Sequence, residues 1–330
     1  MATDRVKPQL VFVHGIGGPR EPQQQLAEWK QALAHGARTA GYASEISALT
    51  MDWSADSSFA YYGDLFTTGQ GQGAGQGAGG GGESDDQQAQ LTLDLLAELL
   101  DELAALPEHR GNRGLDRVRA QLRPGEQAQG TLNTVRHLNR MLAAVAAVPG
   151  LSWGARRLSR VELLGILSQP GRYLRRAEPD AAGRTLDQRI RARVLGCLDP
   201  SRPAIVLAHS LGTVVALESL AEYTGPVSLF VTVGSPITTR GVVWPLLRPR
   251  PPATPESVAA WADFRDGDDV VVPKRRLADA VSPNSAGIRP TPHRLESATL
   301  WSHDATRYLR REEVAGPVME TLAALTAARS

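Results

Sequence analysis

Cysteine is almost absent from the chain, and long apolar runs are absent altogether. Cys197 is the single cysteine in 330 residues, so it forms no internal disulfide and supplies no zinc cluster. Its surroundings, RVLGCLD, follow an apolar helical pattern, which favours a buried structural thiol. No run reaches the roughly 18 apolar residues of a membrane span, and no apolar signal region precedes the first expected strand. We therefore expect a soluble, cytoplasmic protein without a transmembrane segment.

A surplus of charge of either sign is also lacking. The chain has 36 basic and 35 acidic side chains, which gives a net charge of +1. A nucleic-acid-binding protein normally shows a basic excess, so this balance argues against nucleic acid as a partner. Apolar residues make up 42% of the chain, enough for a sizeable core in one large α/β domain or two small ones.

Short apolar runs that end at glycine, serine or aspartate recur along the chain. We expect strands at 10–13, 46–51, 204–208, 227–233 and 260–265. Amphipathic patterns typical of helices separate most of these runs or follow them. Alternation of this kind builds a mostly parallel sheet that is covered by helices on both faces. The predicted fold class is therefore α/β, with a mostly parallel sheet flanked by helices.

The alternation is interrupted by a stretch of different composition. Residues 69–82 read GQGQGAGQGAGGGG, which is too rich in glycine to order itself. Leucine-rich helical patterns follow, without a strand pattern among them. We expect an α/β core at 1–55 and 177–330, a flexible tether at 56–90, and a helical insertion at 91–176.

The segment AIVLAHSLGTVVA places Ser210 between a predicted strand and a predicted helix. In a sharp strand-to-helix turn a serine side chain projects above the sheet, provided that small residues stand two positions before and after it. Ala208 and Gly212 occupy those positions. The unpaired N–H groups of the new helix would point at the reacting oxygen. The pattern favours a nucleophile, and the alternative is a serine that merely caps the helix.

The motif HGIGG begins at His14, directly after the first predicted strand. Gly15 and Gly17 would let backbone N–H groups approach a bound carbonyl closely. We expect the amides of Ile16 and Leu211 to hold the oxyanion that forms when a serine attacks a carbonyl. His14 fits a structural imidazole better than a catalytic base. The alternative for the motif is a simple tight turn after a strand.

A serine nucleophile needs a base and an acid that orients the base. The segment WADFRDGDDVVVP offers four aspartates after a predicted strand. Asp269 stands where the strand would leave onto a loop, and we favour it as the acid. Asp266 is the second choice and Asp268 the third, while Asp263 lies within the expected strand.

The base should be a histidine later in the chain. His303 lies in LWSHDATRYL, beside a predicted short helix capped by Ser302 or Asp304, and we favour it. His293 lies in RPTPHRLES, which indicates a solvated loop. His209 is inside the serine turn and can only line the site. Other histidines lie in helical patterns away from the turn: His35, His109 and His137.

With these segments the chain resembles serine hydrolases of the α/β-hydrolase superfamily, and within it lipase-like and esterase-like members. The likeness rests on VFVHGIGG, AIVLAHSLGTVVALESL, VTVGSPI, FRDGDDVVVP and SHDATRYL, and it spans roughly residues 9–55 and 185–330. The resemblance implies the α/β-hydrolase fold and a catalytic triad of Ser210, Asp269 and His303, in that family's chain order. It also implies cleavage of a carboxylic ester, with no metal or organic cofactor required.

The helical insertion is the only part of the sequence that bears on the substrate. Its leucines could line a lid over the site, which would suit a small, lipid-like ester, or they could pack the inserted helices together. An acyltransferase with the same triad is an alternative function. A binding or scaffold module that contacts a protein partner through the insertion is another. The leucines concerned are Leu95, Leu96, Leu99, Leu100 and Leu103.

Overall fold

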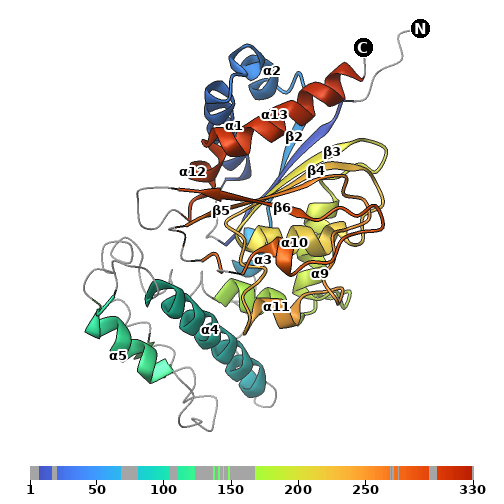
Figure 1. The fold of residues 1–330 in the computed structure, drawn as a ribbon. Coiled ribbons are helices and arrows are strands. Elements are labelled where there is room, and N and C mark those ends of the chain that lie inside the picture. Colours follow the sequence, from blue (N-terminus) through green and yellow to red (C-terminus); the bar gives the residue numbers. More distant parts are fainter. Residues whose placement is uncertain are drawn as a thin grey trace.

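Six parallel strands form one sheet at the centre of the protein, in the order β2-β1-β3-β4-β5-β6 (Figure 1). The computed structural model describes residues 7–16, 21–67, 81–104, 110–122, 168–267, 269, 271–273, 275–296 and 303–328, together with 137, 140, 141, 144 and 148. The strands are β1 (Gln9–Val13), β2 (Asp56–Ala60), β3 (Ala204–His209), β4 (Val227–Val233), β5 (Trp261–Asp266) and β6 (Pro290–Leu295). The predicted fold class is confirmed.

Helices cover both faces of this sheet (Figure 1). One face carries α1 (Pro22–Thr39), α2 (Ile46–Thr50), α12 (Ala305–Leu309) and α13 (Glu312–Ala327). The other carries α3 (Gly63–Thr67), α9 (Leu186–Leu195), α10 (Leu211–Leu220) and α11 (Val243–Leu246). The short 3₁₀ helices are η1 (Ala43–Glu45) and η3 (Leu277–Asp279). Among the described helices, none is long and apolar enough to cross a membrane.

Strand β3 is apolar from Ala204 to Ala208, and its packing shows why. Ile205 and Leu207 pack into the core cluster that contains residues of α1 and α13. Val206 and Ala208 point the opposite way, into the cluster that contains residues of α9 and α10. Alternate residues of a strand face opposite sides, and both sides are covered by helices, so the entire strand is buried.

The strand expected at 46–51 is wrong. Ile46–Thr50 forms helix α2, and the neighbour of β1 is instead β2, whose sequence is DSSFA. β2 is the edge strand of the sheet and only its last residue is fully buried, so it carries almost no apolar signal. β2 and α3 both lie within 56–90, so the sheet continues into residues that the sequence assigns to the tether.

The opposite edge strand, β6, was also not expected. Pro290 and Pro292 lie in it, and an edge strand tolerates proline because one side of its backbone has no partner strand. His293 therefore lies on a strand rather than on the solvated loop that its sequence indicates. Its ring stacks on Phe264 of β5, with the ring centroids 4.6 Å apart.

A helical segment, α4 (Gly81–Ala104) and α5 (Arg113–Leu122), lies in the middle of the chain, between β2 and β3 (Figure 1). Leu96 and Leu100 of α4 are buried in a cluster with Leu115 and Val118 of α5, so these two leucines pack the inserted helices together. Leu95 packs against the main core instead. The side chains of Leu99 and Leu103 lie outside the described residues. The exact bounds of the three expected parts of the chain stay a prediction.

Candidate active site

The turn between β3 and α10 gives Ser210 an unusual backbone conformation. Its φ is 54° and its ψ is −131°, a region that costs a residue other than glycine on the order of 1–3 kcal/mol. Helix α10 then begins close to the end of β1. A Cβ atom on Gly212 would lie 2.5 Å from the carbonyl oxygen of Val13, so only glycine fits there. The small residue at position 212 is thus required by the sharpness of the turn.

The Ser210 hydroxyl bonds to a histidine from the far end of the chain. Ser210 Oγ lies 2.7 Å from Nε2 of His303, and the serine is 2% exposed. The Ser210 side chain makes no capping hydrogen bond to α10. The alternative of a serine that only caps the helix is therefore wrong.

A different helix cap was predicted for the short helix after His303. It is confirmed for Asp304, whose carboxylate accepts a hydrogen bond from the Thr306 N–H at the start of α12.

The other ring nitrogen of His303 bonds to Asp269. His303 Nδ1 lies 2.8 Å from Oδ2 and 3.0 Å from Oδ1 of this buried carboxylate. Three segments that are remote in sequence thus bring together Ser210, His303 and Asp269, in the pairing expected from the sequence.

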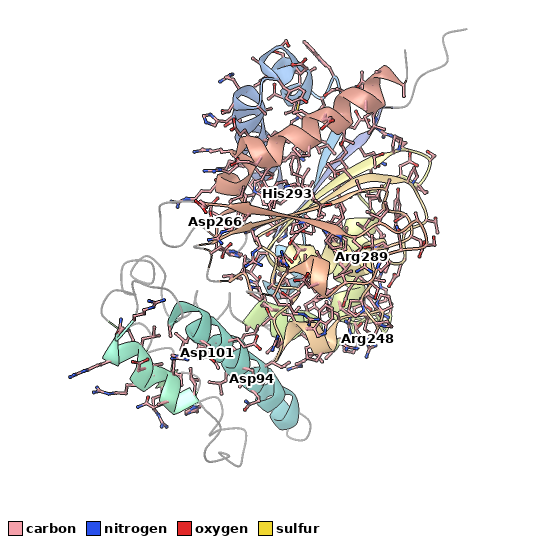
Figure 2. All side chains as sticks on the ribbon, viewed as in Figure 1. Asp94, Asp101, Arg248, Asp266, Arg289 and His293 are labelled. Carbon is pink, nitrogen blue, oxygen red and sulfur yellow. The ribbon has the colours of Figure 1, made fainter. Side chains whose placement is uncertain are left out.

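The competing acids and the competing base lie elsewhere. Asp263 is buried within β5, where it accepts a hydrogen bond from Thr232, and burial raises its pKa to about 6. Asp266 ends β5 and His293 lies on β6, as Figure 2 shows. The carboxylate that bonds to His303 is that of Asp269. Asp268 lies outside the described residues.

Two further donors fix the Asp269 carboxylate. The backbone N–H of Val271 donates to Oδ1 over 3.0 Å, and the hydroxyl of Tyr308 donates to Oδ2 over 2.6 Å. Burial alone would raise the pKa of Asp269, but His303 and these two donors outweigh it and hold the pKa below its usual value. Tyr308 was not singled out from the sequence. Its position five residues after His303, on the predicted short helix, is the only sequence signal for it.

A second imidazole lies beside the catalytic histidine candidate. The rings of His209 and His303 have their centroids 4.6 Å apart. Burial and the nearby His303 lower the pKa of His209 to about 3, so it stays neutral. Its Nε2 is buried and has no hydrogen-bond partner within the described part of the chain. His209 thus lines the site as an uncharged ring, in agreement with the sequence expectation.

The loop after β1 lies directly against Ser210. A Cβ atom on Gly15 would come within 2.6 Å of the Ser210 Cβ, so the backbone approach requires glycine. His14 has the structural role expected for it, since its Nε2 accepts the Tyr62 N–H and its ring stacks on Tyr62. Ile16 is half-buried in this loop.

The expected oxyanion donors lie on two different elements. Ile16 follows Gly15 in the loop beside the serine, and Leu211 is the first residue of α10. The role of their amides stays a prediction. Gly17, which was expected to support the loop, lies outside the described residues.

Gly234, from the motif VTVGSPI, lies under the carboxylate–imidazole pair. Its φ is +60°, which favours glycine. A Cβ atom here would lie 3.1 Å from Asp269 Oδ2 and 3.2 Å from His303 Nδ1, closer than most side chains tolerate. The next residue, Ser235, bonds through its hydroxyl to that of Thr213 over 2.9 Å, which ties the end of β4 to α10.

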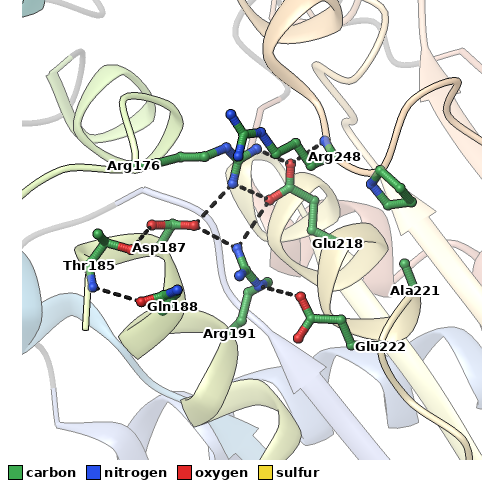
Figure 3. A pocket seen from close by; sticks show the side chains of 10 residues that line it. Arg176, Thr185, Asp187, Gln188, Arg191, Glu218, Ala221, Glu222 and Arg248 are labelled. Atoms are coloured by element: carbon green, nitrogen blue, oxygen red, sulfur yellow. Dashed lines mark hydrogen bonds and ion pairs between the residues drawn. The ribbon is translucent and has the colours of Figure 1, made fainter. Parts of the chain in front are cut away.

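A cavity of about 440 Å³ lies at the opposite end of α10 from Ser210 (Figure 3). Its buried charges are already paired: Glu218 accepts hydrogen bonds from Arg176, and Asp187 accepts from both Arg176 and Arg191. We therefore attribute these charges to the anchoring of α10 rather than to the site.

Across the described ranges, no three His, Cys, Asp or Glu side chains are grouped so that they could hold a metal ion.

No known protein family, curated protein or solved structure matches the chain in the comparisons. The class that the fold defines is an α/β protein with a six-stranded, all-parallel sheet flanked by helices. Hydrogen bonds join a serine directly after β3, an aspartate after β5 and a histidine before α12.

Proposed function

We propose that the protein is a serine hydrolase of the α/β-hydrolase type that cleaves carboxylic esters. The observation that carries the proposal is the continuous hydrogen-bonded series from Ser210 Oγ through the His303 ring to Asp269, with distances of 2.7 and 2.8 Å. A helix cap or a core histidine would need no such series. The same arrangement activates serine for acyl transfer on several unrelated folds, so the role follows from geometry.

In the first half of the proposed reaction, Ser210 Oγ attacks the ester carbonyl while His303 Nε2 takes the hydroxyl proton. Asp269 stabilises the imidazolium that forms and keeps Nε2 directed at the serine. The amides of Ile16 and Leu211 would stabilise the oxyanion, and loss of one such donor typically costs roughly 100- to 1,000-fold in rate. The imidazolium then gives its proton to the departing alcohol, which leaves an acyl group on the serine.

In the second half, water attacks the acyl group. The neutral imidazole of His303 removes a proton from this water, and the tetrahedral intermediate collapses to release the carboxylic acid. The proton returns to Ser210 Oγ, so the enzyme is restored. If an alcohol replaces water in this step, the protein acts as an acyltransferase with the same residues.

Two contacts support a role of the helical segment at the site. Val271, whose N–H holds the Asp269 carboxylate, packs against the cluster formed by α4 and α5. Glu98 of α4 accepts a hydrogen bond from the backbone N–H of Gly241, in the loop that follows β4. A small, lipid-like ester is the substrate that we propose, because an apolar helical segment adjoins the catalytic loops.

A series of p-nitrophenyl esters of increasing acyl length tests this function. Wild-type protein should hydrolyse at least one ester, and Ser210→Ala and His303→Ala should each lower kcat/KM by at least about 1,000-fold. His293→Ala is the matched control and should retain activity. Loss of activity in His293→Ala but not in His303→Ala would contradict the assignment of the base. Product analysis with added alcohol would identify acyl transfer.

A further inference from the structure

Tyr308 connects the acid of the proposed triad to the body of the protein. It lies on α12 and is 2% exposed. Its hydroxyl donates to Asp269 Oδ2 over 2.6 Å and accepts the backbone N–H of Asp266 over 3.2 Å. The Tyr308 oxygen accepts the backbone N–H of Asp266 through a lone pair, so its own proton is directed at the Asp269 carboxylate.

We propose that Tyr308 is a positioning residue of the triad, which sets the proton affinity of the Asp269–His303 pair through its hydrogen bond to the carboxylate. Only the kinetic consequence of this inference rests on the proposed function. The hydrogen bond acts on the Asp269–His303 pair in the resting protein as well. Val271 holds Oδ1 and Tyr308 holds Oδ2, so both carboxylate oxygens have a donor besides the imidazole.

The direction of the effect follows from the charge of the pair. With neutral histidine the pair carries one negative charge, and with imidazolium it carries none. A donor to the carboxylate stabilises the negative form, so removal of the donor makes the pair bind a proton more tightly. Burial and the charge of Asp269 raise the pKa of Tyr308 far above its usual value, so the tyrosine stays protonated and donating.

Other ionisable groups surround the pair and are unchanged when only the tyrosine hydroxyl is removed. They are His14 after β1, His209 at the end of β3, Asp266 at the end of β5 and Asp304 before α12. His209 stays neutral because its pKa lies at about 3. A change in the proton affinity of the pair can then be assigned to the lost hydrogen bond.

The test compares Tyr308→Phe with Tyr173→Phe. Tyr173 is also a buried tyrosine whose hydroxyl donates to a carboxylate, that of Glu218 over 2.7 Å, but it lies outside the site. In Tyr308→Phe the acid limb of the pH profile of kcat/KM should move upward by about one pH unit, as expected for a lost hydrogen bond to a charged group. KM should change by less than about twofold. Tyr173→Phe should leave the acid limb unchanged.

The NMR titration of His303 in the unreacted protein gives the same readout without turnover. It separates the two proposals: an inactive wild-type protein contradicts the proposed function, while the titration still tests Tyr308. If Tyr308→Phe does not fold, site-specific 3-fluorotyrosine at position 308 replaces it. This more acidic hydroxyl is a stronger donor and should weaken proton binding by the Asp269–His303 pair. A His303 titration that neither change moves would overturn the inference.

Discussion

The imidazole of His209 lies beside that of His303, with ring centroids 4.6 Å apart, and the two rings differ in their hydrogen bonds. His303 bonds to a carboxylate on one side and to a serine on the other. His209 is buried, its Nε2 has no partner in the described structure, and its pKa is lowered to about 3. The site therefore contains one imidazole with a hydrogen-bond partner on each side and one that burial keeps neutral.

His209 should make the folded state sensitive to acid. Its pKa is depressed on folding, so the unfolded chain binds the proton more readily and stability falls as pH drops below about 6.5. Between pH 6.5 and 5, wild type should lose on the order of 1–2 kcal/mol of unfolding free energy through this residue. Urea unfolding at a series of pH values measures the slope. His209→Gln should flatten it, and His35→Gln, at an exposed position, should not. Equal slopes for all three proteins would show that His209 titrates normally in the folded state.

Gly15→Ala should damage catalysis more than folding. The added Cβ would lie 2.6 Å from the Ser210 Cβ, so the loop must move away from the serine and carry the Ile16 amide with it. We expect kcat to fall by roughly 100- to 1,000-fold, the usual cost of one oxyanion donor.

Gly316→Ala, on helix α13, is the control for this change. Its Cβ would meet only the Ala40 Cβ at 3.9 Å, and alanine favours a helix by up to about 1 kcal/mol over glycine. It should therefore keep full activity and equal or greater thermal stability. Unchanged kcat in Gly15→Ala would argue against an oxyanion role for this loop.

Asp269→Asn and Asp266→Asn should separate the acid of the triad from its neighbour. Asparagine at 269 removes the charge that holds the His303 ring, and comparable changes in serine hydrolases lower kcat by about 10⁴-fold. Asp266 donates its backbone N–H to the Tyr308 hydroxyl, and asparagine keeps that N–H, so its variant should stay within about tenfold of wild type. Steady-state ester hydrolysis measures both, and the reverse ranking would assign the acid to Asp266.

Glu218→Gln should destabilise the whole protein. This carboxylate is 2% exposed near the C-terminal end of α10 and forms a buried ion pair with Arg176 over 2.7 Å. Removal of one partner from such a pair typically costs about 3–5 kcal/mol. Asp279→Asn breaks the exposed pair with Arg276 and should cost less than about 1 kcal/mol. Equal unfolding free energies for the two variants would show that the buried network contributes little.

The interior of the sheet could be predicted from the sequence, whereas its edges could not. β1 and β3 are buried at every residue, and apart from Gln9 and His209 each is an apolar run that leads into the candidate site. The edge strands are only partly buried: β2 contains three polar residues, and β6 contains two prolines and three polar residues. The hydrophobic pattern of a sequence indicates which residues are buried, not which backbone groups pair with a neighbouring strand. It therefore does not reveal edge strands of this kind.

The site divides in a similar way. Ser210 has a local signature, since a strand, a tight turn and a helix are contiguous in sequence. Asp269 follows a recognisable strand signal and His303 precedes a recognisable helix signal, so their pairing with the serine could be anticipated. The contact of Tyr308 with Asp269 joins residues 39 positions apart and has no periodic signal. Such contacts are set by tertiary packing and emerge only from the structure.

The central claim is that His303 and Asp269 make Ser210 a nucleophile. Labelling with a fluorophosphonate probe tests it most directly, with the modified residue identified by peptide mass spectrometry. Native protein should carry one adduct, on Ser210, and both Ser210→Ala and heat-denatured protein should carry none. His303→Ala should label at least about 1,000-fold more slowly than wild type. A native protein that does not label, or an adduct that persists in Ser210→Ala, would contradict the account.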